Sequence, residues 1–113
     1  SLFHVSYSGV TMALIHGGQP DALILAHEPT REHMRGLPDY KLPSLEALRD
    51  MVLPIARVAN PDCQIVGISV NTQHLSDEEA KACVAEIEDR MGLPTTDPFR
   101  YGAAKLVDAL EAI

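Results

Sequence analysis

The residues best suited to acid-base chemistry follow an apolar run near the start of the chain. Residues 22–26 are uniformly apolar, and His27 and Glu28 come directly after them. A buried strand that ends in an imidazole and a carboxylate places proton acceptors at the carboxyl end of a sheet, where open α/β sheets bind their ligands. We therefore predict catalytic roles for His27, the first choice, and for Glu28.

A long polar segment separates this strand from the next expected helix. It carries Arg31 and Arg35, four residues apart, and then Tyr40. Guanidinium groups bind carboxylates and phosphates through paired N–H donors, so the segment fits an acidic substrate or a phosphorylated cofactor. Connections in α/β units usually take about 2–6 residues, and longer ones tend to be functional or disordered. The alternative is a solvated loop whose arginines pair with its own carboxylates and whose Tyr40 only anchors it.

Two other places offer polar groups to a cofactor. Asn71 ends a second apolar run, where its carboxamide could read an adenine edge; the alternative is a simple cap of the turn. Ser8 and Gly9 lie near an expected helix start, whose free amides and dipole suit an anion, although ordinary capping explains them too. We predict cofactor-binding roles for all three residues.

Ser1 raises a separate hypothesis. If the chain begins there by maturation, its α-amine adjoins a hydroxyl, as in enzymes with an N-terminal nucleophile; limited proteolysis would leave the same terminus. We expect no metal site, because four further histidines lack the spacing of metal ligands: His4, His16, His33 and His74. The spacing of a catalytic triad is not visible either.

Charge and composition exclude several classes of protein. The 113 residues carry a net charge of −7, with only 9 Lys and Arg, which argues against a nucleic-acid partner. No apolar run approaches the roughly 20 residues that span a bilayer, so we expect no membrane association. The two cysteines, Cys63 and Cys83, fit free buried thiols in a reducing compartment better than a disulfide framework. We expect a soluble cytoplasmic protein.

Hydrophobic periodicity predicts helices alternating with strands that are buried on both faces. The expected order is helix, strand, helix, strand, helix, short strand and helix, over residues 7–16, 21–27, 45–59, 63–71, 77–91, 93–96 and 98–113. Ser6 or Ser8 is the predicted cap of the first helix and Gly17 with Gly18 its end, while Pro54 should kink or shorten the second. The predicted starts of the later helices are Ser44, the capping box of Ser76 and Glu79, and Asp97 before Pro98, and Gly92 is the predicted end of the helix over 77–91. The last helix should bury five apolar side chains: Ala103, Leu106, Val107, Leu110 and Ile113.

This order predicts the α/β class, with a parallel sheet and crossover helices. Two or three strands would leave the edges of such a sheet apolar and open. We therefore expect residues 1–113 to be the C-terminal segment of one larger α/β domain, completed by an upstream segment or a companion chain. We also expect a homo-oligomer.

Several motifs in combination resemble one known family. They span nearly the whole chain and occupy residues 7–11, 20–28, 35–40, 66–72 and 75–80, followed by residues 92–98. The family is a formerly uncharacterised group with a P-loop NTPase-like C-terminal domain, whose characterised members look like D-glutamate N-acetyltransferases. The resemblance implies acetyl-CoA as co-substrate, an acidic D-amino acid as the small-molecule substrate, and a companion N-terminal segment of the same polypeptide.

The chain departs from the family pattern in one respect. Nothing in it matches the glycine-rich phosphate loop G-x-x-x-x-G-K-[ST], which lies upstream in the family, so ATP could not be bound here by that device. In the implied reaction Asn71 reads the adenine of acetyl-CoA, Arg31 and Arg35 hold the carboxylates of D-glutamate, and His27 or Glu28 takes the proton. Two alternatives are an ATP-dependent ligase or kinase-like enzyme and a non-catalytic assembly module.

Overall fold

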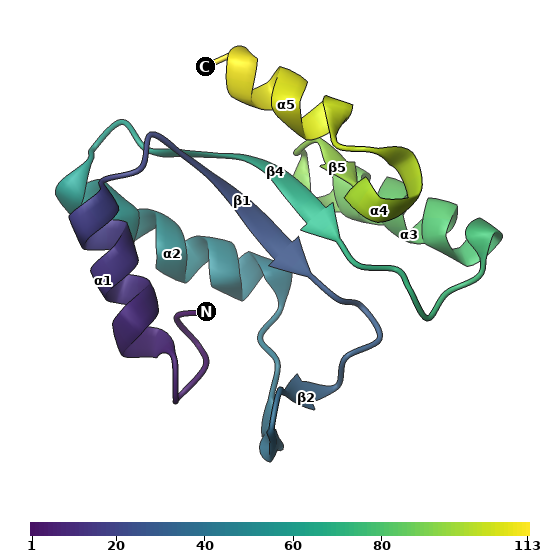
Figure 1. The fold of residues 1–113 in the computed structure, drawn as a ribbon, viewed down its shortest axis with the longest axis horizontal. Helices are drawn as coiled ribbons and strands as arrows, with labels where there is room; N and C mark the ends of the chain where they lie inside the picture. Colours follow the sequence, from purple (N-terminus) through teal and green to yellow (C-terminus); the bar gives the residue numbers. More distant parts are fainter. The chain divides into compact units, whose positions relative to one another are not determined.

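The structure is a computed structural model that describes residues 1–113, and these divide into two compact units. Unit 1 comprises Ser1–Leu23 with Arg31–Ile65, and unit 2 comprises Ile24–Thr30 with Val66–Ile113. Figure 1 labels the helices and most of the strands.

A parallel sheet of three strands confirms the predicted α/β class. The strands are β1 (Ala22–His27), β4 (Gln64–Val70) and β5 (Thr95–Thr96), in the order β1-β4-β5. The β4 and β5 strands run parallel, with Ile68 opposite Thr95. At the end of β1, the Asn71 amide donates to the His27 carbonyl at 2.8 Å. The short third strand that the sequence predicts within residues 93–96 is confirmed as β5, and it lies at one edge of the sheet.

Burial matches the prediction more closely for β4 than for β1. Val66, Ile68 and Val70, which point to one face of β4, are buried. On the opposite face Gly67 is buried, and Ile65 and Ser69 are half-buried, so β4 is covered on one face and partly covered on the other. In β1 only Leu25 is buried, and Ile24 is 37% exposed, so the prediction that β1 is buried on both faces is wrong for residues 1–113. The physical reason is its position: β1 is the other edge strand, and it pairs with β4 alone.

Unit 1 is built around two helices, α1 (Ser8–Gly18) and α2 (Leu45–Ala59). The His16 ring donates through Nε2 to the Ile55 carbonyl at 3.0 Å and so joins the two helices. Ser44 caps α2 as its sequence predicts, since its hydroxyl accepts from the Ala47 amide. Pro54 lies inside α2 without shortening it.

The ends of α1 differ from the prediction. Its N-cap is Tyr7, with no side-chain hydrogen bond, so neither Ser6 nor Ser8 caps it. Gly17 and Gly18 are helical, and the helix ends at Gln19, which adopts the left-handed conformation with φ 49°. A glycine permits the end of a helix but does not impose it, because the next residue can adopt the same conformation.

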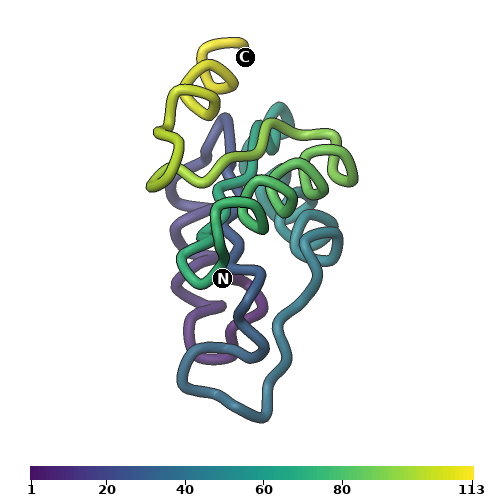
Figure 2. The backbone as a smooth tube through the Cα atoms, turned by 90° about the vertical axis from the view of Figure 1, so that its right-hand side faces the viewer, coloured from purple at the N-terminus to yellow at the C-terminus, as the bar shows by residue number.

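The long polar segment is not the aperiodic loop that its sequence suggests. It contains an antiparallel hairpin of β2 (His33–Met34) and β3 (Leu37–Lys41), within the blue part of the tube in Figure 2. Gly36 has φ 75° at the turn, a conformation that glycine adopts without steric cost. Met34 is only 6% exposed, so its side chain anchors the hairpin in the apolar core. Because β2 has only two residues, its sequence is too short to show the alternation of apolar and polar residues that predicts a strand.

Unit 2 contains α3 (Asp77–Met91), α4 (Pro98–Tyr101) and α5 (Ala104–Glu111). Ser76 and Glu79 form the predicted capping box of α3, and Gly92 ends that helix with φ 66°. The predicted single last helix is wrong, because Gly102, with φ 79°, separates α4 from α5. Of its five predicted core residues only Leu106 is buried, and Val107 and Ile113 are 46% and 58% exposed.

Two close contacts hold the β5 side of unit 2 together. A Cβ atom on Gly67 would lie 2.6 Å from Cδ2 of Leu106 and 3.0 Å from the Pro94 carbonyl oxygen, so a larger residue there would require the Leu106 side chain to move. The Glu88 carboxylate accepts from the Thr95 amide at 3.1 Å and pairs with Lys105. Bonds of this kind satisfy the open edge of a sheet.

Both cysteines are free thiols, as predicted; Cys63 is buried and Cys83 half-buried. None of the helices is both long and apolar enough to cross a membrane.

Candidate functional site at the carboxyl ends of β1 and β4

Polar residues of unit 2 gather where β1 and β4 end. The bond between the Asn71 amide and the His27 carbonyl joins the two strand ends, and Glu28 follows directly. The structure therefore brings together three residues that the sequence singles out, one from the end of β4 and two from the end of β1. This is the edge at which open α/β sheets bind ligands.

His74 joins this cluster, and sequence reasoning missed it. Its Nε2 atom lies 3.8 Å from Oε1 of Glu28. The Glu28 side chain is only 15% exposed, whereas that of His74 is 64% exposed. The spacing of the histidines excludes His74 as a metal ligand, and no other role for it follows from the sequence. Its position three residues after Asn71, in the loop that follows β4, is the feature of the sequence that could have placed it at this site.

Asn71 caps the turn after β4, which is the alternative to a cofactor-binding role that the sequence left open. Its carboxamide oxygen accepts from the Gln73 amide at 3.1 Å. An Asx turn of this kind fixes the direction of the chain after the strand. The NH₂ group and the second lone pair of the oxygen are then the parts of Asn71 suited to a ligand.

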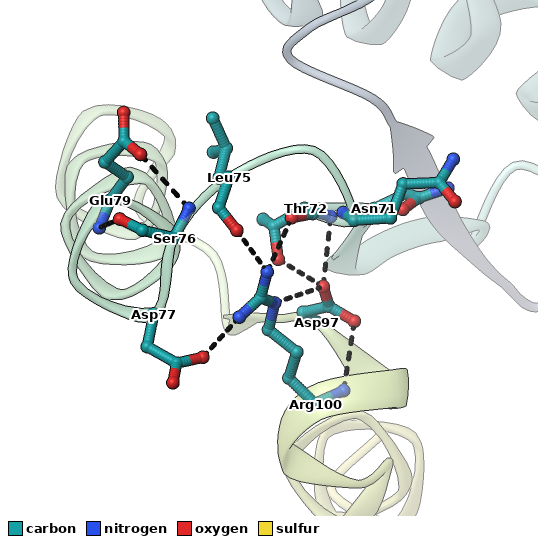
Figure 3. A network of polar contacts seen from close by, with 9 residues as sticks. Asn71, Thr72, Leu75, Ser76, Asp77, Glu79, Asp97 and Arg100 are labelled. Carbon is teal, nitrogen blue, oxygen red and sulfur yellow. Dashed lines mark hydrogen bonds and ion pairs between the residues drawn. The ribbon is translucent and has the colours of Figure 1, made fainter.

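Asp97 is the buried anchor of the loop that carries His74. Its side chain accepts from the Thr72 amide at 3.0 Å and from the Thr72 hydroxyl (Figure 3). The other carboxylate oxygen caps α4 by accepting from the amides of Phe99 and Arg100, at 3.0 and 3.3 Å. The sequence predicted this cap but not the tie to Thr72, because the two residues lie 25 positions apart.

The environment of Asp97 favours its charged form. Burial acts to raise the pKa of this carboxyl group, but the bonds from the Thr72 hydroxyl and amide and from the Arg100 and Phe99 amides outweigh it. The pKa of Asp97 is therefore lowered below its usual range. The carboxylate is a fixed negative charge with a structural role.

Arg100 closes the same loop from the α4 side. Its guanidinium donates to the carbonyls of Thr72, at 2.9 Å, and Leu75, and it pairs with the Asp77 carboxylate (Figure 3). It also lies 3.9 Å from the Asp97 carboxylate. Because Thr72 and Leu75 flank His74, the backbone on both sides of this histidine is held. Nothing in the local sequence marks Arg100 for that role.

The other predicted site residues belong to unit 1. The Ser1 hydroxyl accepts from the Phe3 amide at 3.1 Å, which makes it part of a local turn. Ser8 and Gly9 occupy the first turn of α1, but the Ser8 amide donates to the His4 carbonyl at 2.8 Å, so this amide is not free for an anion as the hypothesis expects. Arg31 and Arg35 are exposed, and the Arg35 carbonyl accepts from the His4 ring at 3.2 Å.

Tyr40 is 47% exposed on β3, so its ring is not a buried anchor for the hairpin. Among residues 1–113, no three His, Cys, Asp or Glu side chains are grouped so that they could hold a metal ion.

Comparisons with known proteins match all or nearly all of the chain. The profile of a family described as a domain of unknown function, the DUF1611_C P-loop domain, matches residues 1–107. A D-glutamate N-acetyltransferase from Tritonibacter scottomollicae is 74% identical over 113 residues, all of this chain and 34% of that protein. One from a Pseudoalteromonas species is 41% identical over 107 residues, 95% of this chain and 32% of that protein.

The fold has a close counterpart among solved structures. The crystal structure of a DUF1611 family protein from Anabaena variabilis matches all of this chain, and 33% of its own, with a TM-score of 0.91 and 34% identity. The chain thus spans about a third of the length of the curated relatives that it matches.

Proposed function

This chain belongs to the DUF1611 family, and from that membership we propose that it forms part of a D-glutamate N-acetyltransferase. The observation that carries the proposal is the 74% identity over the full chain to a protein of that name. Because every residue of unit 2 lies within the matched range, the polar cluster at the carboxyl ends of β1 and β4 belongs to the shared part. The location of the cluster agrees with a ligand site.

The companion of this chain is an upstream segment of the same polypeptide. Relatives of this chain are about three times its length, which leaves room for such a segment and for a phosphate-binding loop within it. The exposed edge of β1, with Ile24 37% exposed, is compatible with further strands.

The acetyl donor is acetyl-CoA. Its adenine suits the carboxamide NH₂ group of Asn71, and its phosphates suit the Ser8 hydroxyl and the Gly9 amide in the first turn of α1. The acceptor is D-glutamate, whose two carboxylates suit Arg31 and Arg35, and Tyr40 on β3 is a further candidate for contact with the substrate.

The reaction needs a base and a leaving group. A base at the carboxyl ends of β1 and β4 takes one proton from the substrate ammonium, and the amine nitrogen then attacks the thioester carbonyl carbon. The candidates that the sequence offers for this base are His27, the last residue of β1, and Glu28, which follows it. The C–N bond forms and the C–S bond breaks, and the second nitrogen proton goes to the departing sulfur. The products are N-acetyl-D-glutamate and CoA thiol, with one proton released to solvent.

The test uses the polypeptide that carries this segment together with its proposed upstream part. With acetyl-CoA and D-glutamate we expect release of CoA thiol and a product heavier by one acetyl group, and no turnover of L-glutamate. Arg35→Ala should raise the KM for D-glutamate, while Arg49→Ala, an exposed arginine paired with Asp50 on α2, should not. Turnover with Mg-ATP but none with acetyl-CoA would instead support the ligase or kinase alternative.

A further inference from the structure

We infer that His74, oriented by the carboxylate of Glu28, is the general base that takes the proton from the substrate ammonium. The inference rests on the proposed acetyltransferase function and assigns the proton transfer to a residue that the sequence did not single out. It starts from the 3.8 Å between Nε2 of His74 and Oε1 of Glu28.

The two side chains differ in the property that decides their roles. Glu28 is 15% exposed and His74 is 64% exposed, so the imidazole is the group that a substrate can reach. A carboxylate that faces one ring nitrogen favours a proton on that nitrogen and leaves the lone pair on the other. In this arrangement Nε2 carries the proton towards Glu28, and Nδ1 is the acceptor.

The distance between Nε2 of His74 and Oε1 of Glu28 brings the two groups within reach of each other without a formed hydrogen bond. It exceeds the roughly 2.7–3.2 Å of a formed hydrogen bond, and catalytic hydrogen bonds often tighten only when substrate is bound. When His74 takes the proton, the imidazolium gains a full charge, and the nearby Glu28 carboxylate stabilises it. Glu28 thus acts as an orienting residue, and His74 as the residue that touches the substrate.

The backbone around His74 is held in place, which a general base requires. Thr72 is tied to Asp97, and Arg100 donates to the carbonyls of Thr72 and Leu75 on either side of His74. The Asn71 side chain fixes the start of the same loop through the Gln73 amide. A catalytic group on a loop needs such support to keep its position within a fraction of an ångström.

The kinetic test compares three histidine variants in the full polypeptide. His74→Ala should lower kcat by about 10²–10⁴-fold, the usual contribution of a general base, with little change in KM. Added imidazole should restore part of the lost rate. His33→Ala, on β2 in unit 1, should keep the wild-type rate. His27→Ala should lower kcat less than His74→Ala, and a larger loss in His27→Ala would overturn the inference.

A second comparison tests the link to Glu28. Glu28→Gln should lower kcat, and the double variant with His74→Ala should be no slower than His74→Ala alone, because Glu28 acts through His74. Losses that multiply in the double variant, a wild-type kcat in His74→Ala, or no rescue by imidazole would each overturn the inference. A wild-type polypeptide inactive with acetyl-CoA and D-glutamate would overturn the proposed function, and the role of His74 with it.

Discussion

Thr72 donates two hydrogen bonds, from its backbone amide and from its hydroxyl, to the same carboxylate oxygen of Asp97, Oδ2. Both residues are buried, at 0% and 3% exposure. The pair fixes the start of the loop after β4 to the start of α4. It therefore links the loop that carries His74 to the rest of unit 2.

Removing the hydroxyl of this pair should destabilise the protein. Thr72→Val keeps the shape of the side chain but leaves a buried carboxylate with one donor fewer, which we expect to cost about 1–3 kcal/mol. Urea unfolding of the wild type and the variant measures the difference. Thr11→Val is the matched control: the Thr11 hydroxyl donates to the Tyr7 carbonyl on the surface of α1, and its loss should cost no more than about 0.5 kcal/mol.

Stability should fall at acid pH through Asp97. Its pKa is lower in the folded protein than in the unfolded chain, so its contribution is complete above the unfolded value of about 3.9 and is lost as the pH falls through the folded value. Asp97→Asn should be less stable than wild type near neutral pH and should lose less stability between about pH 5 and 3. Urea midpoints across this range give the slopes. An Asp97→Asn variant that keeps the wild-type slope would contradict this role of Asp97.

Replacing glycine by alanine should change the free energy of unfolding in opposite directions at Gly67 and at Gly17, because the space around the two residues differs. Gly67→Ala places a Cβ atom against Leu106 and the Pro94 carbonyl and should cost about 1–3 kcal/mol, the usual price of overpacking. Gly17→Ala lies in α1 with no atom within 4 Å of the added carbon, and it should stabilise by about 0.4–1 kcal/mol. Thermal unfolding measures both. A stable Gly67→Ala variant would contradict the close packing of β4 against α5.

Arg100 should control the mobility of the loop after β4. Lysine keeps the charge but cannot reproduce the planar set of donors that reaches Thr72, Leu75 and Asp77, so Arg100→Lys should loosen residues 72–77. Hydrogen exchange should accelerate in the peptides that cover this loop. Arg90→Lys, on α3, should leave exchange in the loop unchanged; equal protection in both variants would contradict the role of Arg100.

The two thiols should react slowly and in a fixed order. Burial is the largest cause that raises the pKa of both Cys63 and Cys83, and the thiolate is the reactive form. Cys63 is fully buried and Cys83 half-buried, so alkylation of the native protein near pH 8 should modify Cys83 first. Peptide mapping by mass spectrometry identifies the order. In denaturant the two cysteines should react at similar rates, and an early reaction of Cys63 in the native protein would contradict its burial.

Features that depend on neighbouring residues could be predicted from the sequence. The caps at Ser44, Ser76 and Asp97 and the end of α3 at Gly92 all appear where expected, because each bond joins residues a few positions apart. The parallel sheet followed from the apolar runs and the helices between them. The position of His27, Glu28 and Asn71 at one sheet edge followed from the same alternation.

Features that depend on distant residues were decided by the tertiary structure. The hairpin of β2 and β3 depends on a buried place for Met34, and the incomplete burial of β1 depends on its position at the edge of the sheet. The ties from Asp97 and Arg100 to the loop after β4, and the approach of His74 to Glu28, join residues that no local pattern relates. Sequence periodicity reports what each element buries, whereas the partners of a polar side chain are set only when the strands and helices pack together.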